Sequence, residues 1–266
     1  MKKISVVIRN KNQSGSLNFL LKNLTERYNE IDEIIVLDNL SVDNSKEITE
    51  KYLAKFITID KFSYGGSANL AAQSANNDII VIFSAHAYPV SEDFFQQILK
   101  RFNNNENLAG LRCLHNSGDY KNYIDKVSSK KDPNVSGLIF CGSAFNKKIW
   151  KKHPFKSDIQ TMEDKEWSLR VLKNNYDIEF SPSIFCYDIK RSPKQLFFRF
   201  KNETIGGYQL WHTEYNFNIA FKSLLGSLLK IVKTFFIDIF YAYKRFFFLL
   251  KFINNKPDNT IHLLLN

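Results

Sequence analysis

The feature that most constrains the fold is a series of short apolar segments in the first hundred residues, each followed by a segment with helical spacing. Residues 4–8, 34–37, 56–59 and 79–83 are apolar and rich in β-branched side chains, as is typical of strands buried on both faces of a parallel sheet. Leu17, Leu20, Leu21 and Leu24 recur at helical spacing. Further helices are expected up to about residue 53, over 68–75 and over 94–102. These β-α repeats predict an α/β fold with a mostly parallel, Rossmann-like sheet flanked by helices.

Composition and charge narrow the class of protein. The 266 residues include 37 Lys and Arg against 27 Asp and Glu, a net charge of +10, and 44% are hydrophobic, which predicts a folded chain and excludes disorder. Three scattered cysteines exclude a disulfide framework and favour a reducing compartment. The apolar run near the first residue is shorter than a secretory signal. A cytoplasmic protein is therefore expected.

Polar clusters follow three of the predicted strands. Arg9, Asn10 and Asn12 follow the first strand, Asp38 and Asp43 follow the second, and the segment Ser84-Ala85-His86 follows the fourth. Ligands of doubly wound sheets bind at the carboxyl ends of the strands, so these residues form the candidate site. The chain has neither a GxGxxG after the first strand nor a GxxxxGK[ST] segment. Nicotinamide-binding and P-loop proteins are therefore disfavoured.

Four segments in this order resemble inverting glycosyltransferases of family 2, which have the GT-A fold. The resemblance covers about residues 3–200 and is carried by SVVIRNKN at 5–12, VLDNLSVDNS at 36–45, FSYGGSANLA at 62–71 and MEDKEW at 162–167. It implies a nucleotide-sugar donor, with UDP- or dTDP-sugars favoured. It also implies the following donor-binding residues: Arg9, Asn10, Asn12, Asp38, Asp43, Gly65, Asn69, Ser84, Ala85 and His86.

By the same resemblance, Asp38 accepts a hydrogen bond from the imide of a pyrimidine base, and Asp43 orders the loop or the ribose. Read from the residues alone, both are also good turn and N-cap residues. Asp164 is the predicted catalytic base, which removes the proton of the acceptor hydroxyl, and Glu163 is the alternative base. Both acids also suit the first turn of a helix. Trp167 is expected to pack in the core.

The chain departs from the family pattern where a metal-binding DxD is expected, because Ser84-Ala85-His86 stands there. Two ways of neutralising the leaving diphosphate follow. His86 and Asp188 hold a divalent cation, Mn²⁺ or Mg²⁺, or the site is metal-independent and Lys190 and Arg191 face the diphosphate together with His86. A third interpretation of this departure is that the chain is an inactive descendant of the family.

The second half is expected to bind the acceptor. The nucleotide-sugar half covers about residues 1–103 and the acceptor half about 104–210, in one glycosyltransferase domain over 1–210. Residues 104–135 are predicted to be a loop-bearing segment that varies with the acceptor. Strands are expected over 137–145, 178–180 and 184–186, and helices over 147–151 and 197–210.

Residues 211–266 are predicted to form an amphipathic helical tail. Within 221–252 lie eight Phe, six basic residues and one acid, Asp238. Five of the lysines share one stripe of a helical wheel, and the opposite side is apolar. The longest stretch without Lys or Arg, residues 234–243, is shorter than the ~20 residues that span a bilayer. The tail is therefore expected to lie on the anionic inner face of the cell membrane, or to pack on protein. Because aromatic and basic residues segregate, nucleic-acid binding is not expected.

These features together predict an inverting glycosyltransferase that extends a bacterial surface polysaccharide on a saccharide or polyprenyl-linked acceptor. One alternative is a non-catalytic membrane-associated partner with the same fold. Another is a sugar nucleotidyltransferase, for which the segment from Arg9 to Gly15 is a poor match.

Overall fold

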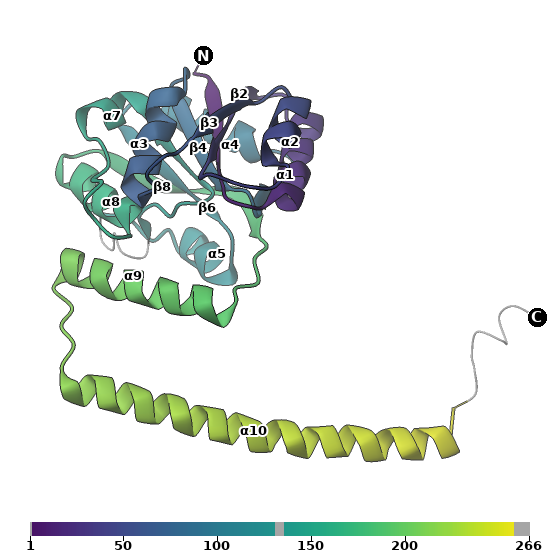
Figure 1. The fold of residues 1–266 in the computed structure, drawn as a ribbon. Helices are drawn as coiled ribbons and strands as arrows, with labels where there is room; N and C mark the ends of the chain where they lie inside the picture. The colour runs from purple at the N-terminus through teal and green to yellow at the C-terminus, as the bar shows by residue number, and fades with distance from the viewer. Residues whose placement is uncertain (1, 131–135, 258–266) are drawn as a thin grey trace, which may run out of the picture. The chain divides into compact units, whose positions relative to one another are not determined.

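A computed structural model describes residues 2–130 and 136–257 of the chain. Its contacts divide the chain into two compact units, Met1–Thr213 and Glu214–Asn266, and each unit is described by itself. The first unit is an α/β fold built on one curled sheet (Figure 1). The predicted tail beyond residue 257 lies outside the described residues.

The sheet has the strand order β3-β2-β1-β4-β7-β6-β8-β5. Strands β1, β2, β3 and β4 pair in parallel, as do β6 and β8, whereas β7 is antiparallel to β4 and β6, and β5 is antiparallel to β8. The predicted mostly parallel sheet is thus confirmed. The strands are β1 (Ile4–Asn10), β2 (Ile31–Asp38), β3 (Lys55–Thr58), β4 (Ile79–Ser84), β5 (Ala87–Pro89), β6 (Leu108–Leu114), β7 (Ser143–Asn146) and β8 (Asp177–Tyr187).

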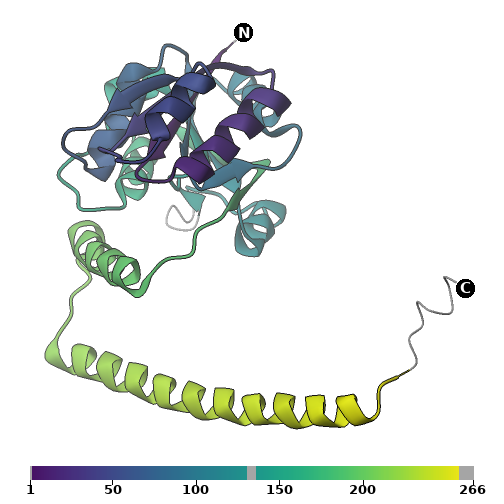
Figure 2. The same cartoon turned by 45° about the vertical axis from the view of Figure 1, so that its right-hand side comes forward.

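Helices cover both faces of this sheet (Figure 2). Buried side chains of α1 and α4 pack on one face, and those of α3, α7 and α8 pack on the other. The helices of the first unit are α1 (Ser14–Arg27), α2 (Ser45–Lys51), α3 (Tyr64–Ser74), α4 (Phe94–Asn104), α5 (Ser117–Ile124), α7 (Lys147–Lys152), α8 (Glu163–Lys173) and α9 (Pro193–Trp211).

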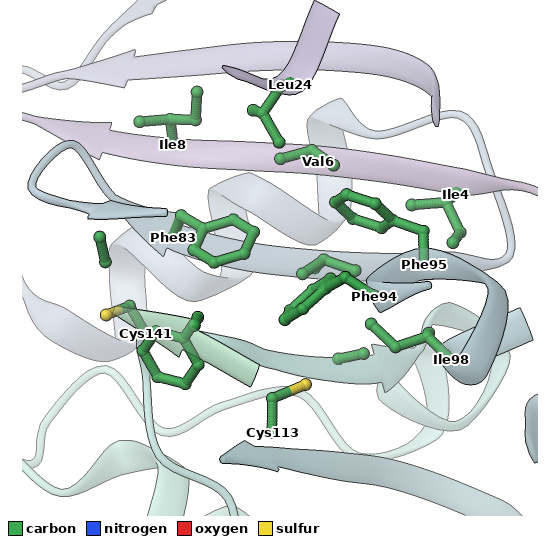
Figure 3. Close-up of a cluster of buried hydrophobic side chains, with 14 of the residues drawn as sticks. Ile4, Val6, Ile8, Leu24, Phe83, Phe94, Phe95, Ile98, Cys113 and Cys141 are labelled. Carbon is green, nitrogen blue, oxygen red and sulfur yellow. The ribbon is translucent and has the colours of Figure 1, made fainter. Parts of the chain in front are cut away.

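Alternation along the strands explains the two cores, because successive strand side chains point to opposite faces. Ile4, Val6 and Ile8 belong to the core beneath α1 and α4, whereas Val7 belongs to the core beneath α3 and α8. Figure 3 shows the first of these cores, in which Phe83 packs near Phe94. The continuous apolar runs of the sequence therefore reflect strands that are buried on both sides.

Three expectations for the second half are wrong in detail. The segment 104–135, predicted to be loop-bearing, contains β6, a wholly buried strand in the middle of the sheet, as well as α5. Of the predicted strand 137–145, only residues 143–145 pair in the sheet, as part of β7 (Ser143–Asn146). The two short strands predicted over 178–186 are one continuous strand, β8. Residues 131–135 of the predicted loop lie outside the described residues.

The second unit contains one long helix, α10 (Phe217–Asn254), of 38 residues. At 1.5 Å per residue it is about 57 Å long. The side chain of Asn216 caps its first turn by accepting a hydrogen bond from the Ile219 N–H. None of its residues is buried, and its predicted helical character is confirmed. Over the part of the chain that the structure describes, no helix is both long enough and apolar enough to cross a membrane.

Candidate active site

The carboxyl ends of β1, β2 and β4 bring three of the predicted polar clusters together. In the register of the sheet, Asn10 lies beside Asp38, and Arg9 lies beside Ser84. The Ala85 N–H donates to the Arg9 carbonyl oxygen at 3.0 Å, which continues the pairing past the end of β4. Clusters that are far apart in the sequence thus form one edge of the sheet, as the strand ends predict.

Asp38 is the centre of a buried hydrogen-bond network. Its carboxylate accepts from Asn10 Nδ2 at 2.8 Å and from the Ser41 N–H at 2.7 Å. Asn10 Nδ2 also donates to Ser45 Oγ at 2.8 Å, and only 2% of Asp38 is exposed. Each carboxylate oxygen can accept more than one hydrogen bond, so this network fixes the carboxylate and leaves it acceptor capacity.

Asn12 and Asp43 fix the loop that follows β2. Asn12 has a positive φ of 49° and accepts a hydrogen bond from the Val42 N–H at 2.8 Å. Asp43 accepts from the N–H of Ser14, the first residue of α1, at 2.8 Å and from Ser45 Oγ at 2.5 Å. Burial alone would raise the pKa of Asp43, but the hydrogen bonds from Ser45 and Ser14 outweigh it and lower that pKa. These contacts fit the loop-ordering role expected of Asp43.

Gly65 and Asn69 occupy α3, which begins after the cap residue Ser63. The Asn69 side chain accepts from Trp150 Nε1 and from the Phe155 N–H, both at 2.9 Å, and its Nδ2 donates to the Phe155 carbonyl oxygen at 2.8 Å. It thus joins α3 to the segment before α8. Neither residue lines the two cavities described below, and their donor-binding role stays a prediction.

Replacing Gly65 by alanine is expected to lower the free energy of unfolding by about 1–3 kcal/mol, the usual cost of overpacking. A Cβ atom there would overlap the backbone carbonyl oxygen of Lys156. The matched control is Gly15→Ala in α1, where an added Cβ meets nothing within 4 Å. The control should leave the unfolding free energy unchanged or raise it by up to about 1 kcal/mol. Urea denaturation measures both, and equal effects would contradict the close approach at Gly65.

His86 lies between β4 and β5, next to Asp188. The Asp188 N–H donates to the His86 carbonyl oxygen at 2.9 Å, and the His86 ring meets the Tyr187 ring at a centroid distance of 4.8 Å. Nδ1 of His86 lies 2.7 Å from Gln13 Oε1. Burial, together with the charges of Arg191 and Arg9, lowers the pKa of His86 to about 4, against the opposing effect of Asp188. The imidazole is therefore neutral at pH 7.

The residues around His86 fit a divalent cation only if a bound ligand supplies part of its coordination. Nε2 of His86 is buried without a hydrogen-bond partner among the described residues, and a neutral imidazole is a metal ligand. The carboxylate of Asp188 is exposed beside it. No group of three or more His, Cys, Asp or Glu that could hold a metal occurs in the described part of the chain. Diphosphate oxygens and water would have to complete the coordination, as is common for Mg²⁺.

Lys190 and Arg191 lie in the connection between β8 and α9. Arg191 Nη2 donates to the Tyr187 hydroxyl at 2.6 Å, and its guanidinium lies over the Tyr187 ring. Arg191 lines the larger cavity described below, whereas Lys190 is exposed and does not. Of the two basic residues predicted to face the diphosphate, Arg191 is thus the one that lines a cavity.

Glu163 and Asp164 begin α8, directly after Met162, whose φ is 69°. Glu163 is buried and faces inward, with its Oε1 3.5 Å from Arg9 Nη1. Asp164 accepts from the Phe140 N–H at 2.8 Å and from the Lys165 N–H at 2.7 Å. Burial raises the pKa of Glu163 to about 7, with a further contribution from Asp164 and against the attraction of Arg9. Burial also raises the pKa of Asp164.

Two cavities, of about 430 and 240 Å³, meet at Asp164, which lines both. Glu163 lines only the smaller cavity. The larger one is bounded by Tyr187 and Arg191 on the side of His86, and by α9. The expected core position of Trp167 is confirmed, because its ring is fully buried and its Nε1 donates to the His153 carbonyl oxygen.

The raised pKa of Glu163 predicts a pH-dependent effect of the Glu163→Gln substitution. Between its ordinary pKa of 4.5 and about 7, the folded state keeps a proton that the unfolded chain releases. The unfolding free energy of the parent therefore falls as the pH rises through this window, and the variant lacks this loss. The unfolding free energy of the variant minus that of the parent should therefore grow by up to about 3 kcal/mol from pH 4.5 to pH 8.

Chemical denaturation at these two pH values measures the difference. The exposed Glu106 provides a control, since Glu106→Gln should shift the unfolding free energy equally at both. A difference for Glu163→Gln that stays constant with pH would mean that Glu163 is ionised in the folded protein throughout.

Sequence reasoning missed several residues of the larger cavity. Tyr64, His115, Thr161, Gln195, Phe198, Arg199, Asn202 and Glu203 line it. His115 follows β6 directly, so the signal that identified the other clusters, a polar residue after a buried strand, would also have identified it had β6 been recognised. The α9 residues carry no such signal, because only tertiary packing places that helix at the cavity.

Comparison with known proteins places these features in a family. A family model described as glycosyl transferase family 2 matches residues 5–167. The chain is 24% identical over 233 residues to a dolichyl N-acetyl-α-D-glucosaminyl phosphate 3-β-D-2,3-diacetamido-2,3-dideoxy-β-D-glucuronosyltransferase of Methanococcus voltae. That match covers 74% of this chain and 70% of the relative.

Solved structures share the fold at low sequence identity. One is a mannosyltransferase from Pyrobaculum calidifontis in complex with GDP-Man and Mn²⁺, with a TM-score of 0.64 and 13% identity. The match covers 80% of this chain and 65% of that one, so the chain spans slightly less than two thirds of that enzyme. Another is glucosyl-3-phosphoglycerate synthase from Mycobacterium tuberculosis with Mn²⁺, UDP and glucosyl-3-phosphoglycerate, with a TM-score of 0.55, 13% identity and coverage of 74% and 75%.

These likenesses confirm the predicted fold and the predicted enzyme class. The matched residues 5–167 make up more than half of the chain, and they include the strand-edge clusters and the acidic pair of α8. The chain therefore belongs to glycosyl transferase family 2, as its motifs predict.

Proposed function

We propose that the chain transfers a sugar, with inversion, from a nucleotide-sugar to a saccharide acceptor carried on a lipid, in the synthesis of a cell-surface polysaccharide. The observation that carries this proposal is the place of Asp164, which lines both cavities at the start of α8. The neighbouring Glu163 is turned inward to Arg9. Asp164 is therefore the better-placed base of the acidic pair.

In the proposed reaction, Asp164 accepts the proton of the acceptor hydroxyl while the hydroxyl oxygen attacks the anomeric carbon of the donor sugar. The bond from that carbon to the nucleoside diphosphate breaks, and the diphosphate leaves on the opposite side. A carboxylate whose pKa is raised is a stronger base when it is ionised. The raised pKa of Asp164 supports this role.

The donor is proposed to lie along the edge formed by β1, β2 and β4, with its base near Asp38 and its diphosphate near His86. Uridine or thymidine diphosphate sugars fit best, because their imide N–H can donate to the fixed carboxylate of Asp38. Arg191 offers a guanidinium to the diphosphate. His86 and Asp188 would hold a divalent cation there, which would supply further charge neutralisation when it is bound.

The lipid-linked acceptor is supported by two independent features. The relative from Methanococcus voltae is named for a dolichyl-phosphate-linked saccharide. In addition, α10 carries eight Phe and six basic residues over 221–252, a composition that suits the surface of an anionic membrane. The chain is proposed to be peripheral on the cytoplasmic face of the cell membrane.

Nucleotide release from a panel of UDP-, dTDP- and GDP-sugars tests the proposal. The assay is run with and without a crude extract of lipid-linked saccharides, and with and without EDTA. Release that requires the extract is the expected result, and sensitivity to EDTA would support a cation at His86. Nucleotide binding without release from any donor would instead favour a non-catalytic binding partner.

A further inference from the structure

A fourth polar cluster stands at the carboxyl end of β6. His115 comes directly after Leu114, the last residue of that strand. Since β6 runs parallel to β1 and β4 through the intervening antiparallel β7, its carboxyl end meets the same edge of the sheet as Arg9 and His86. His115 lines the larger cavity, which Asp164 also lines.

A buried ion pair holds the His115 ring from behind. His115 Nδ1 lies 2.6 Å from Asp119 Oδ2, and the other carboxylate oxygen, Oδ1, accepts from Arg112 Nη2 at 2.7 Å. Arg112 Nη1 also donates to the Gly137 carbonyl oxygen at 3.0 Å. The side chains of Arg112 and Asp119 are 10% and 4% exposed, whereas that of His115 is 27% exposed. A buried pair thus ends in an imidazole that is open to the cavity.

The ring faces are fixed as well. The Phe185 ring stacks on His115 at a centroid distance of 5.3 Å and an interplanar angle of 18°. The Asn116 amide nitrogen lies 3.3 and 3.2 Å from the two ring nitrogens. Such nearly equal distances place the amide over the ring rather than in line with either nitrogen.

The carboxylate at Nδ1 decides what His115 can offer to a ligand. A carboxylate that accepts from Nδ1 holds the proton on that nitrogen and fixes the orientation of the ring. Nε2 of the neutral ring is then a bare acceptor. Burial alone would raise the pKa of Asp119, but the hydrogen bonds from His115 and Arg112 and the charge of Arg112 lower it, so this carboxylate remains ionised.

We propose that His115 binds the saccharide acceptor by accepting a hydrogen bond from one of its hydroxyl groups at Nε2, and that Asp119 and Arg112 are positioning residues for this contact. The inference rests on the proposed transferase function. The acceptor, rather than the donor, is favoured because the proposed base-binding residues Asn10 and Asp38 do not line the larger cavity, and Arg191, proposed to face the diphosphate, is the one donor-side residue of that proposal that does. Asp164 does line it, so a hydroxyl held by His115 shares the cavity with the base.

Steady-state kinetics on the full chain tests the acceptor contact. His115→Phe keeps a ring that can stack on Phe185 and removes both nitrogens. It should raise the apparent KM for the lipid-linked saccharide extract about tenfold or more, the effect of one lost hydrogen bond. The Kd of the nucleotide, measured by calorimetry, should stay within about twofold, since the donor residues are untouched.

Two further variants separate positioning from a merely structural role. Asp119→Asn should raise the same KM in the same direction with an unchanged nucleotide Kd, and His115→Gln should fall between His115→Phe and the parent. His153→Gln, which changes a histidine outside the cavity, is the control and should leave both constants unchanged. An unaltered acceptor KM in His115→Phe, or an equal loss of nucleotide affinity, would overturn the proposal.

Nitrogen NMR tests the positioning part without turnover. The ¹⁵N spectrum of the parent should show His115 with a protonated Nδ1 and a bare Nε2, and Asp119→Asn should lose this preference. The reverse tautomer in the parent would overturn the proposal, whatever the activity. Failure of the parent to release nucleotide with any donor would count against the proposed function, whereas transfer that is indifferent to His115 would count only against this inference.

Discussion

The Asp164→Asn variant is expected to transfer sugar about a thousandfold more slowly than the parent and to bind nucleotide with a Kd within about twofold of it. General-base catalysis contributes about 10²–10⁴-fold to the rate of a reaction, and asparagine cannot accept the proton. The proposed donor contacts at Asp38 and Asn10 lie in a separate hydrogen-bond network that this substitution leaves intact. Nucleotide release in the presence of acceptor and calorimetric titration with nucleotide give the two quantities.

The pH dependence of the parent provides a second readout of the same group. Because burial raises the pKa of Asp164, the ionised fraction of the base, and with it the transfer rate, should grow as the pH rises through that raised value. The Asp164→Asn variant should not show this rise. Its residual rate should change with pH only through the titration of other groups, which the substitution leaves in place.

Two control variants make the result specific. Asp158→Asn changes an exposed carboxylate in the segment before α8 and should leave the rate unchanged. Glu163→Gln removes the carboxylate that faces Arg9 and should lower the rate less than Asp164→Asn does. A larger loss in Glu163→Gln would move the base to Glu163, and loss of nucleotide binding in Asp164→Asn would remove Asp164 from the base role.

The first half of the fold was predictable mainly because its central strands, β1 and β4, are buried on both faces. Runs such as residues 4–8 and 79–83 contain no polar interruption apart from Ser5, and the sheet register then places Arg9, Asp38 and Ser84 at one edge. The order of the strands also follows the usual rules for parallel sheets. Local sequence and final structure therefore agree for β1 to β4, whereas the three-residue strand β5 is not predicted by the sequence.

The strand β6 was missed because tertiary contacts, not local preference, stabilise two of its residues. Gly110 leaves room for Leu138 and the Ala144 carbonyl oxygen, which would otherwise meet a Cβ at about 3 Å. Arg112 is buried inside the strand because Asp119, on the following helix, neutralises it. Neither partner is evident in a segment that reads as Asn-rich and polar. The same error hid His115, which is identifiable only once β6 is known to end at Leu114.

Within the site, motifs could identify single residues but not their pairings. The acidic pair at 163–164 was found from its sequence, yet nothing in the sequence shows that Glu163 turns to Arg9 while Asp164 lines both cavities. Similarly, Asn69 was found as a motif residue, and the structure shows that its amide joins α3 to Trp150 and Phe155. The direction in which each side chain points depends on tertiary packing. The sequence alone therefore does not distinguish the roles of neighbouring residues such as Glu163 and Asp164.

Replacing the five lysines of the α10 stripe by glutamine is expected to weaken binding to anionic vesicles by about a thousandfold. Each basic residue near an anionic membrane contributes about 1 kcal/mol, and about 1.4 kcal/mol corresponds to a factor of ten. The apolar side chains of the helix are left in place, so weak binding to neutral vesicles should persist. The lysines are Lys222, Lys230, Lys233, Lys244 and Lys251.

Co-sedimentation with phosphatidylglycerol vesicles, at several salt concentrations, measures this change. Binding of the parent should fall as the salt concentration rises, because ions screen exposed charges, and binding of the variant should depend on salt much less. A control with the same change in net charge replaces five exposed lysines of the first unit and should lower vesicle affinity far less. These are Lys46, Lys61, Lys100, Lys126 and Lys173. Equal losses in the two variants would mean that net charge, not α10, attracts the membrane, and unchanged binding in the α10 variant would favour a helix that packs on protein.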